Sequence, residues 1–211
     1  MIGIVDYGMG NLRSVEKALQ SVGAQTRFVS APADLAGLTG LVLPGVGAFA
    51  DCVANLRATG LWEPIREWIA ADRPFFGICL GYQMLFDGSA EGPGIEGLGV
   101  FQGKVEKFDL PDKSLKVPQM GWNEVEVVHP SAFTEGVVSG DHVYFVHSYY
   151  PRPADPALVA MRTTYGQPFA SAVGKGNLFA TQFHPEKSQR VGLKLLGNFV
   201  KLAAATSTSI L

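Results

Sequence analysis

The sequence predicts an α/β fold: a mostly parallel central sheet flanked by helices, with an additional region of antiparallel strands. In the first half, short apolar segments alternate with segments whose apolar residues recur at helical spacing, which predicts parallel strands joined by helices. In the second half, apolar runs follow one another with only turn signals between them, which predicts antiparallel pairing. The length of 211 residues suits one domain over residues 1–211.

The first half predicts strands over residues 2–6, 25–29, 40–43 and 75–78. Between them, one helix is expected to begin near Leu12, and two more over about 50–58 and 61–71. Parallel strands carry functional groups at their carboxyl ends. We therefore expect chemistry in the loop 44–49 and at Cys79.

The second half predicts strands over residues 99–108, 122–128, 142–149, 158–164 and 169–183, the last with a turn at 174–177. A closing helix is expected over about 187–205. Residues 84–86 continue at helical spacing after Cys79, and residues 87–97 are expected to form a glycine-rich loop.

Composition excludes several classes of function. Hydrophobic residues make up 47% of the chain and charged residues 17%, as in a compact fold with much buried sheet. The net charge is −2 and there is no basic stripe, which argues against nucleic acid or a membrane surface as main partner. The chain has neither an apolar stretch of about 18 residues nor a basic leader. We therefore expect a cytoplasmic protein.

Cys79 stands between Gly77 and Gly81, where a predicted strand turns into a helical segment. This is the layout of a nucleophile elbow, in which a crowded turn leaves no room for a Cβ at either glycine. The N–H groups of the following helical turn are expected to favour the thiolate. A disulfide between Cys52 and Cys79 is disfavoured, because nothing indicates an oxidising compartment.

His184-Pro185-Glu186 follows an apolar segment of strand type. Pro185 restrains His184 to an extended conformation, so His184 and Glu186 are expected to point to a common side. An imidazole that shuttles a proton and a carboxylate that orients it are what a catalytic thiol requires.

Acyl transfer also requires N–H donors for the developing oxyanion. The backbone N–H of Leu80, directly after the nucleophile, is one candidate. The loop 44–49 is the other, since its glycines allow the backbone to approach a substrate or to reorient.

Other features leave alternatives open. His147 is either structural or part of a substrate pocket. Met120 and Trp122 belong either to the core or to a partner surface, where such residues are enriched. Gly8-Met9-Gly10 has the start of a dinucleotide fingerprint, but Arg13 stands at the third glycine position, which disfavours nucleotide binding.

Over nearly its whole length the chain resembles the class I (triad) glutamine amidotransferases. Segments 77–83 and 184–186, together with the loop 44–49, carry this resemblance. The N-terminal segment 6–15 and the segment 116–123 are more specific. They resemble the glutaminase subunits that serve a synthase of the histidine pathway.

The resemblance implies a flavodoxin-like fold and hydrolysis of L-glutamine to glutamate and ammonia, without cofactor or metal. Cys79 would attack the side-chain amide, His184 would protonate the leaving ammonia and later activate water, and Glu186 would orient His184. The oxyanion hole would lie at Val46, Gly47 and Leu80. The positions that match glutamine-binding residues are Gly45, Gly47, Gln83, Ser148 and Tyr149.

The resemblance also implies a partner, a (β/α)8-barrel cyclase subunit that forms a heterodimer with this chain and receives ammonia through a tunnel. The face toward it would include Asn11, Met120 and Trp122. Glutaminases of this group are nearly silent alone, because the backbone at 45–47 must first reorient. Gln119 stands where the family usually has a histidine, so a titratable group is missing there.

Two other interpretations are weaker. The glutaminase of a pyridoxal-phosphate synthase is disfavoured by the sequence of the loop 44–47. A catalytically silent scaffold is disfavoured by the intact Cys79, His184 and Glu186.

Overall fold

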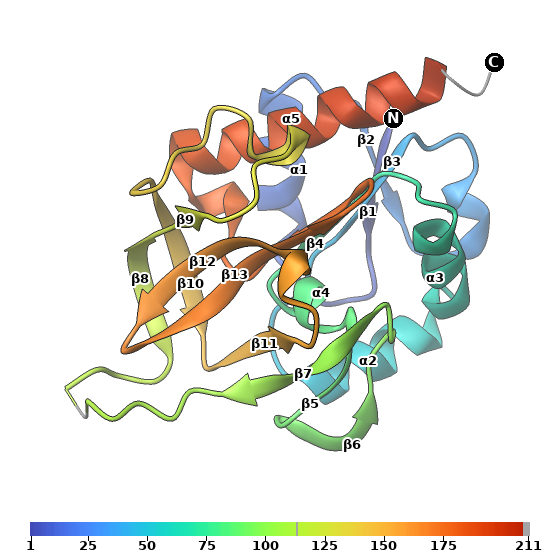
Figure 1. The fold of residues 1–211 in the computed structure, drawn as a ribbon. Helices are drawn as coiled ribbons and strands as arrows, with labels where there is room; N and C mark the ends of the chain where they lie inside the picture. Colours follow the sequence, from blue (N-terminus) through green and yellow to red (C-terminus); the bar gives the residue numbers. More distant parts are fainter. Residues whose placement is uncertain (113, 209–211) are drawn as a thin grey trace.

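The computed structural model describes residues 1–112 and 114–208 (Figure 1). Within these residues a central sheet has the strand order β2-β1-β3-β4-β14-β13-β12-β9. The strands from β2 to β14 pair in parallel, as the alternating pattern predicts. They are β1 (Ile2–Val5), β2 (Thr26–Val29), β3 (Gly40–Leu43), β4 (Phe75–Ile78) and β14 (Leu178–Thr181).

The remaining strands of this sheet are antiparallel: β13 (Gln167–Lys175), β12 (Val159–Tyr165) and β9 (Glu126–Val127). The predicted strand over 169–183 is therefore a hairpin of β13 and β14. The predicted strand over 122–128 divides into β8 (Gln119–Glu124) and β9. The reason is a change of partner at buried Val125, since β8 pairs with β10 (His142–His147) and β9 with β12.

Helices cover both faces of the sheet (Figure 1). On one face, α1 (Leu12–Ser21) and α5 (Gln189–Thr208) pack against side chains such as Ile4, Phe76 and Phe179. On the other, α2 (Phe49–Ala58) and α3 (Trp62–Ala70) pack against a second buried cluster. The closing helix begins two residues later than predicted, because residues 185–187 form the 3₁₀ turn η4 (Pro185–Lys187).

A smaller sheet lies beside α2, with strand order β11-β7-β5-β6 (Figure 1). Its strands are β5 (Phe86–Ser89), β6 (Gly92–Glu96), β7 (Phe101–Lys107) and β11 (Tyr149–Pro153). The prediction of a loop over 87–97 is therefore wrong, because these residues form the β5–β6 hairpin, in which glycines allow the strands to approach closely. A Cβ on Gly88 would lie 2.9 Å from the carbonyl oxygen of Ile95.

The predicted continuation of the helix through 84–86 is also wrong. The helix after Cys79, α4 (Leu80–Gln83), is one turn long. Beyond it Met84 and Phe86 are fully buried, and Phe86 begins β5. Short 3₁₀ turns complete the described elements: η1 (Pro32–Leu35), η2 (Ala132–Thr134) and η3 (Pro156–Leu158). In the described part of the chain, no helix is long and apolar enough to cross a membrane.

Candidate active site

Cys79 occupies a strained turn between β4 and α4. Its φ of 55° lies in a region that L-residues rarely adopt. A Cβ on Gly81 would collide with the carbonyl of Leu43, and one on Gly77 would lie 3.0 Å from the carbonyl oxygen of Gly81. The flanking glycines therefore allow the close approach that presents Cys79 at the carboxyl end of the sheet.

His184 and Glu186 lie together just beyond β14. His184 is extended, as the following proline predicts, and its Nδ1 lies 2.8 Å from Oε1 of Glu186. Both side chains are almost completely buried. Ser188 holds the turn, because its hydroxyl donates to the carbonyl of His184 and accepts from the backbone N–H of Tyr144 in β10.

The pKa of His184 reflects opposing effects. Burial lowers it, but the negative charge of a Cys79 thiolate and the carboxylate of Glu186 raise it more, to about 10. Nε2 of His184 has no hydrogen-bond partner among the residues that the structure describes. The ring therefore holds a proton on a nitrogen that is free to transfer it.

A cavity of about 270 Å³ opens beside these residues. It is smaller than the pockets of about 300–1,000 Å³ that hold drug-sized ligands, and so suits an amino acid. The cavity gathers most of the residues that the sequence predicts for catalysis and binding. Its lining is Val46, Gly47, Cys79, Leu80, Gln83, Glu91, Pro118, Val146, His147, Ser148, Tyr149 and His184.

Two predicted residues lie just outside this lining. Gly45 is packed behind it, where a Cβ would lie 2.7 Å from the hydroxyl of Tyr7 and 2.8 Å from Cβ of Leu80. Glu186 lies behind His184, as an orienting acid should. Gln83 lines the cavity, and its Oε1 is buried and has no hydrogen-bond partner in the described part of the chain.

Residues 44–47, here called the oxyanion loop, lie against the other predicted oxyanion donor, the backbone N–H of Leu80. The backbone N–H of Leu80 donates to the carbonyl of Gly45 at 3.3 Å. One of the predicted donors is therefore occupied by the loop itself. A substrate oxyanion would have to replace this carbonyl.

Two buried side chains hold the oxyanion loop from behind. The hydroxyl of Tyr7 donates to the carbonyl of Pro44 at 2.8 Å. The thiol of Cys52 lies 3.6 Å from the carbonyl of Val46, and burial raises the pKa of this thiol to about 11, so it keeps its proton. Both cysteines are free thiols, which confirms that they form no disulfide.

Two residues of the site were missed by the sequence analysis. Glu91 lies in the turn between β5 and β6, lines the cavity and accepts from the backbone N–H of Phe49 at 2.9 Å. Gln182 is fully buried, and its Nε2 lies 3.7 Å from Sγ of Cys79. Glu91 belongs to the segment expected as a loop, and no sequence pattern marks it. Gln182 lies at the end of an expected strand, and this position could have indicated that it belongs to the site.

His147 combines the two alternatives left open, because it is buried and also lines the cavity. Its Nδ1 lies 2.7 Å from the carbonyl of Tyr149, and the side-chain amide of Gln119 lies 3.0 Å from its Nε2. Burial lowers the pKa of His147 to about 4. Gln119 is therefore an inward-facing neighbour of a neutral histidine.

The residues expected to face a partner are on the surface. Met120 is 65% exposed and Trp122 is 48% exposed, so their assignment to the core is excluded. Asn11 is exposed at the start of α1, where its side chain makes no capping hydrogen bond.

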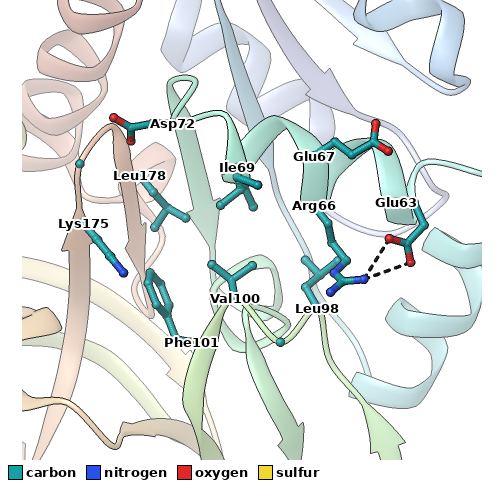
Figure 2. Close-up of a pocket in the computed structure, with 13 residues that line it drawn as sticks. Glu63, Arg66, Glu67, Ile69, Asp72, Leu98, Val100, Phe101, Lys175 and Leu178 are labelled. Atoms are coloured by element: carbon teal, nitrogen blue, oxygen red, sulfur yellow. Dashed lines mark hydrogen bonds and ion pairs between the residues drawn. The ribbon is translucent and has the colours of Figure 1, made fainter.

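A second cavity, of about 730 Å³, lies near the amino-terminal starts of β4 and β14 (Figure 2). Its lining combines apolar side chains, among them Ile69 and Val100, with charged ones, and Arg66 forms an ion pair with Glu63 at 2.9 Å. No residue predicted for catalysis or binding lines it. Within residues 1–112 and 114–208, no group of three His, Cys, Asp or Glu side chains could hold a metal ion.

Comparison with known proteins agrees with this geometry. The family model "Glutamine amidotransferase class-I" matches residues 3–202. Imidazole glycerol phosphate synthase subunit HisH of Rhodopirellula baltica is 53% identical over 199 residues, which cover 94% of this chain and 96% of that protein. The HisH subunit of Syntrophotalea carbinolica is 50% identical over 203 residues, covering 94% and 98%.

A solved structure described as a glutamine amidotransferase matches with a TM-score of 0.75 at 24% identity, over 96% of this chain and 98% of that one. At this identity the likeness shows the fold, and it agrees with the α/β class that the sequence predicts. The chain therefore belongs to the class I glutamine amidotransferase family and, within it, to the family of imidazole glycerol phosphate synthase subunit HisH.

Proposed function

We propose that this chain is the glutaminase subunit of imidazole glycerol phosphate synthase, and that Cys79, His184 and Glu186 hydrolyse L-glutamine to glutamate and ammonia. One observation carries the assignment of residues. Cys79 on its strained turn shares a cavity of amino-acid size with His184, whose other nitrogen is bound to buried Glu186. A nucleophile, a base and an orienting acid are thus together.

In the first half-reaction the Cys79 thiolate attacks the side-chain amide carbon of glutamine, and a C–S bond forms. His184 gives the proton on Nε2 to the amide nitrogen, the C–N bond breaks and ammonia leaves. The raised pKa of His184, about 10, keeps this proton available at neutral pH. The product is a thioester on Cys79.

In the second half-reaction water attacks the thioester, and His184 takes up its proton. The C–S bond breaks, glutamate leaves and the Cys79 thiolate is restored. Glu186 holds the ring throughout, since its bond to Nδ1 fixes which nitrogen faces the cavity.

Substrate binding is proposed for the polar groups of the cavity. Oε1 of Gln83 is a free acceptor for a substrate N–H, and Ser148 and Tyr149 lie along the same wall. The carboxylate of Glu91 is complementary to an α-ammonium group. The proposed oxyanion donors are Leu80 and the backbone at Val46 and Gly47.

We also propose that the described oxyanion loop is a resting conformation. The Gly45 carbonyl occupies the N–H of Leu80, so full activity requires the loop to reorient. A partner that binds the reoriented loop better than the resting one would shift this equilibrium.

The proposed partner is a (β/α)8-barrel cyclase subunit of the histidine pathway, bound as a heterodimer and supplied with ammonia directly. Exposed Met120 and Trp122, with Asn11, support a docking face. The cytoplasm is the proposed compartment, because it keeps a catalytic thiol reduced.

The test is ammonia release from saturating glutamine, measured on the chain alone and with the purified barrel subunit. We expect slow release alone, strong stimulation by the partner and loss of release in Cys79→Ser, with the exposed Gln102→Met as a control. No ammonia release in either condition would exclude glutaminase activity. Full activity without the partner would contradict the proposal that the oxyanion loop is in a resting conformation.

A further inference from the structure

A buried amide lies against the nucleophile. Gln182, two residues before His184, has no exposed surface. Its Nε2 lies 3.7 Å from Sγ of Cys79, and its Oε1 accepts from Nε2 of Gln83 at 3.1 Å. Gln182 therefore connects the sulfur to a side chain that reaches the cavity.

The register of the sheet explains this position. Thr181 in β14 pairs with Ile78 in β4, and the backbone N–H of Cys79 donates to the carbonyl of Thr181 at 2.8 Å. Gln182, the residue directly after β14, is therefore level with the nucleophile. From the other side, the carbonyl of Ser171 in β13 accepts the backbone N–H of Gln182 at 2.8 Å, so its backbone is held firmly.

The hydrogen-bond chain also determines which way each amide points. Nε2 of Gln83 lies 3.0 Å from the carbonyl of Tyr149, which can only accept, so this atom of Gln83 must be the nitrogen. The atom of Gln182 that faces the same nitrogen must then be the oxygen. The remaining atom, which faces Cys79, is the NH₂ group.

We propose that Gln182 is a positioning residue for glutamine hydrolysis: its NH₂ group holds the Cys79 sulfur as a thiolate, and its oxygen fixes the amide of Gln83. The inference rests on the proposed role of Cys79 as nucleophile. A donor favours the thiolate, because a charged sulfur accepts a hydrogen bond better than a thiol does. With the amide of Gln83 fixed, its buried Oε1 has no partner in the described part of the chain, and the side chain keeps its place in the cavity lining.

The NH₂ group of Gln182 compensates for a helix dipole that is weaker than the sequence predicts. The predicted helix after Cys79 is a single turn, α4, and so contributes little of a helix dipole. A side-chain donor at 3.7 Å from the sulfur takes over part of that role. Burial alone would not require an amide here, since an apolar side chain of equal length would fill the space.

The test uses Gln182→Met, which removes donor and acceptor at nearly constant size, and Gln182→Glu, which keeps an acceptor for Gln83 but places a carboxylate beside the sulfur. Exposed Gln102→Met is the matched control. The first readout is the rate at which iodoacetamide alkylates Cys79, followed by mass spectrometry across pH. The second is the separate measurement of kcat and KM for glutamine with the barrel subunit.

We expect the midpoint pH of alkylation to rise by about one unit in Gln182→Met and by more in Gln182→Glu, with no change in the control. kcat should fall about tenfold or more in both. KM should rise mainly in Gln182→Met, because only that variant releases Gln83. The other titratable groups around the sulfur and the cavity keep their identity in all variants: His184, His147, Glu186, Glu91, Tyr7, Tyr149 and Cys52.

Unchanged alkylation profiles in folded variants, with kcat within twofold of the parent, would overturn the proposal. Thermal unfolding shows which variants are folded, and if Gln182→Met fails to fold, Gln182→Glu, which differs by one atom, decides. If the parent chain releases no ammonia but its alkylation profile still depends on Gln182, the proposed function fails while the interaction with Cys79 stands.

Discussion

His184 shows how the chemistry of one residue depends on neighbours from distant segments. Glu186 lies two residues after His184 in the same turn, whereas Cys79 lies in the other half of the chain and is brought near by the pairing of β4 with β14. The pKa of about 10 in the folded chain stands against a usual value of 6.5. The stabilisation from protonated His184 is therefore complete below about pH 6.5 and is lost as the pH rises through about 10.

Replacing Glu186 by Gln should reduce this pH dependence, because it removes one of the groups that raise the pKa of His184. We expect the melting temperature of Glu186→Gln to fall less than that of the parent between pH 6.5 and 10. Glutaminase kcat should fall by roughly 10²–10⁴-fold. Calorimetry across pH, with the exposed Glu126→Gln as control, checks this. If the melting temperatures of Glu186→Gln and the parent fell equally with pH, the contribution of Glu186 to the pKa of His184 would be contradicted.

At the scale of elements, the start of α5 supports the turn that carries Glu186. A Cβ on Gly192, near the start of this helix, would collide with the carbonyl of Pro185 in η4. At Gly197, five residues further along the same helix, a Cβ would meet only Val22 among the described residues outside the helix, at an ordinary contact distance of 3.9 Å. The same substitution at these two positions should therefore act in opposite directions.

We expect Gly192→Ala to lower stability by about 1–3 kcal/mol through overpacking and to reduce glutaminase activity, because η4 must move. Gly197→Ala should raise stability by about 0.5–1 kcal/mol, since alanine favours a helix interior. Denaturant unfolding of both variants provides the comparison. Equal effects would show that α5 does not position Glu186.

At the scale of the whole molecule, the exposed apolar side chains of β8, Met120 and Trp122, are the clearest candidates for a docking face. Trp122 in β8 is half-exposed, and Pro118, a few residues earlier, lines the cavity. A partner covering Trp122 would therefore also lie close to the site.

Replacing Trp122 by Ala should weaken binding of the proposed barrel subunit by about tenfold or more, because buried tryptophans dominate the energetics of interfaces. The stability of the free chain should change little. Ile95, an exposed apolar residue in β6 on the smaller sheet, provides the control as Ile95→Ala. Titration calorimetry checks both, and equal affinities for parent and Trp122→Ala would place the docking face elsewhere.

Local patterns predicted much of the fold and part of the site. The parallel strands, the glycines around Cys79 and the pairing of His184 with Glu186 follow from short-range rules of spacing, crowding and proline geometry. Gln182 and Glu91 could not be assigned in this way. Gln182 lies beside Cys79 because of the register between β4 and β14. Glu91 lies in the turn of the β5–β6 hairpin, which the glycine-rich sequence did not indicate. That residues 1–211 form one domain stays a prediction.

The sequence by itself determined the α/β class and indicated the proposed nucleophile and base, because each depends on residues close together in the chain. Only the tertiary structure decided the state of the oxyanion loop and the direction of the Gln182 amide. The first depends on whether the carbonyl of Gly45 meets the N–H of Leu80, and the second on a hydrogen-bond chain from Tyr149 through Gln83. Such orientations are set by contacts between distant segments, and no spacing of residues along the chain records them.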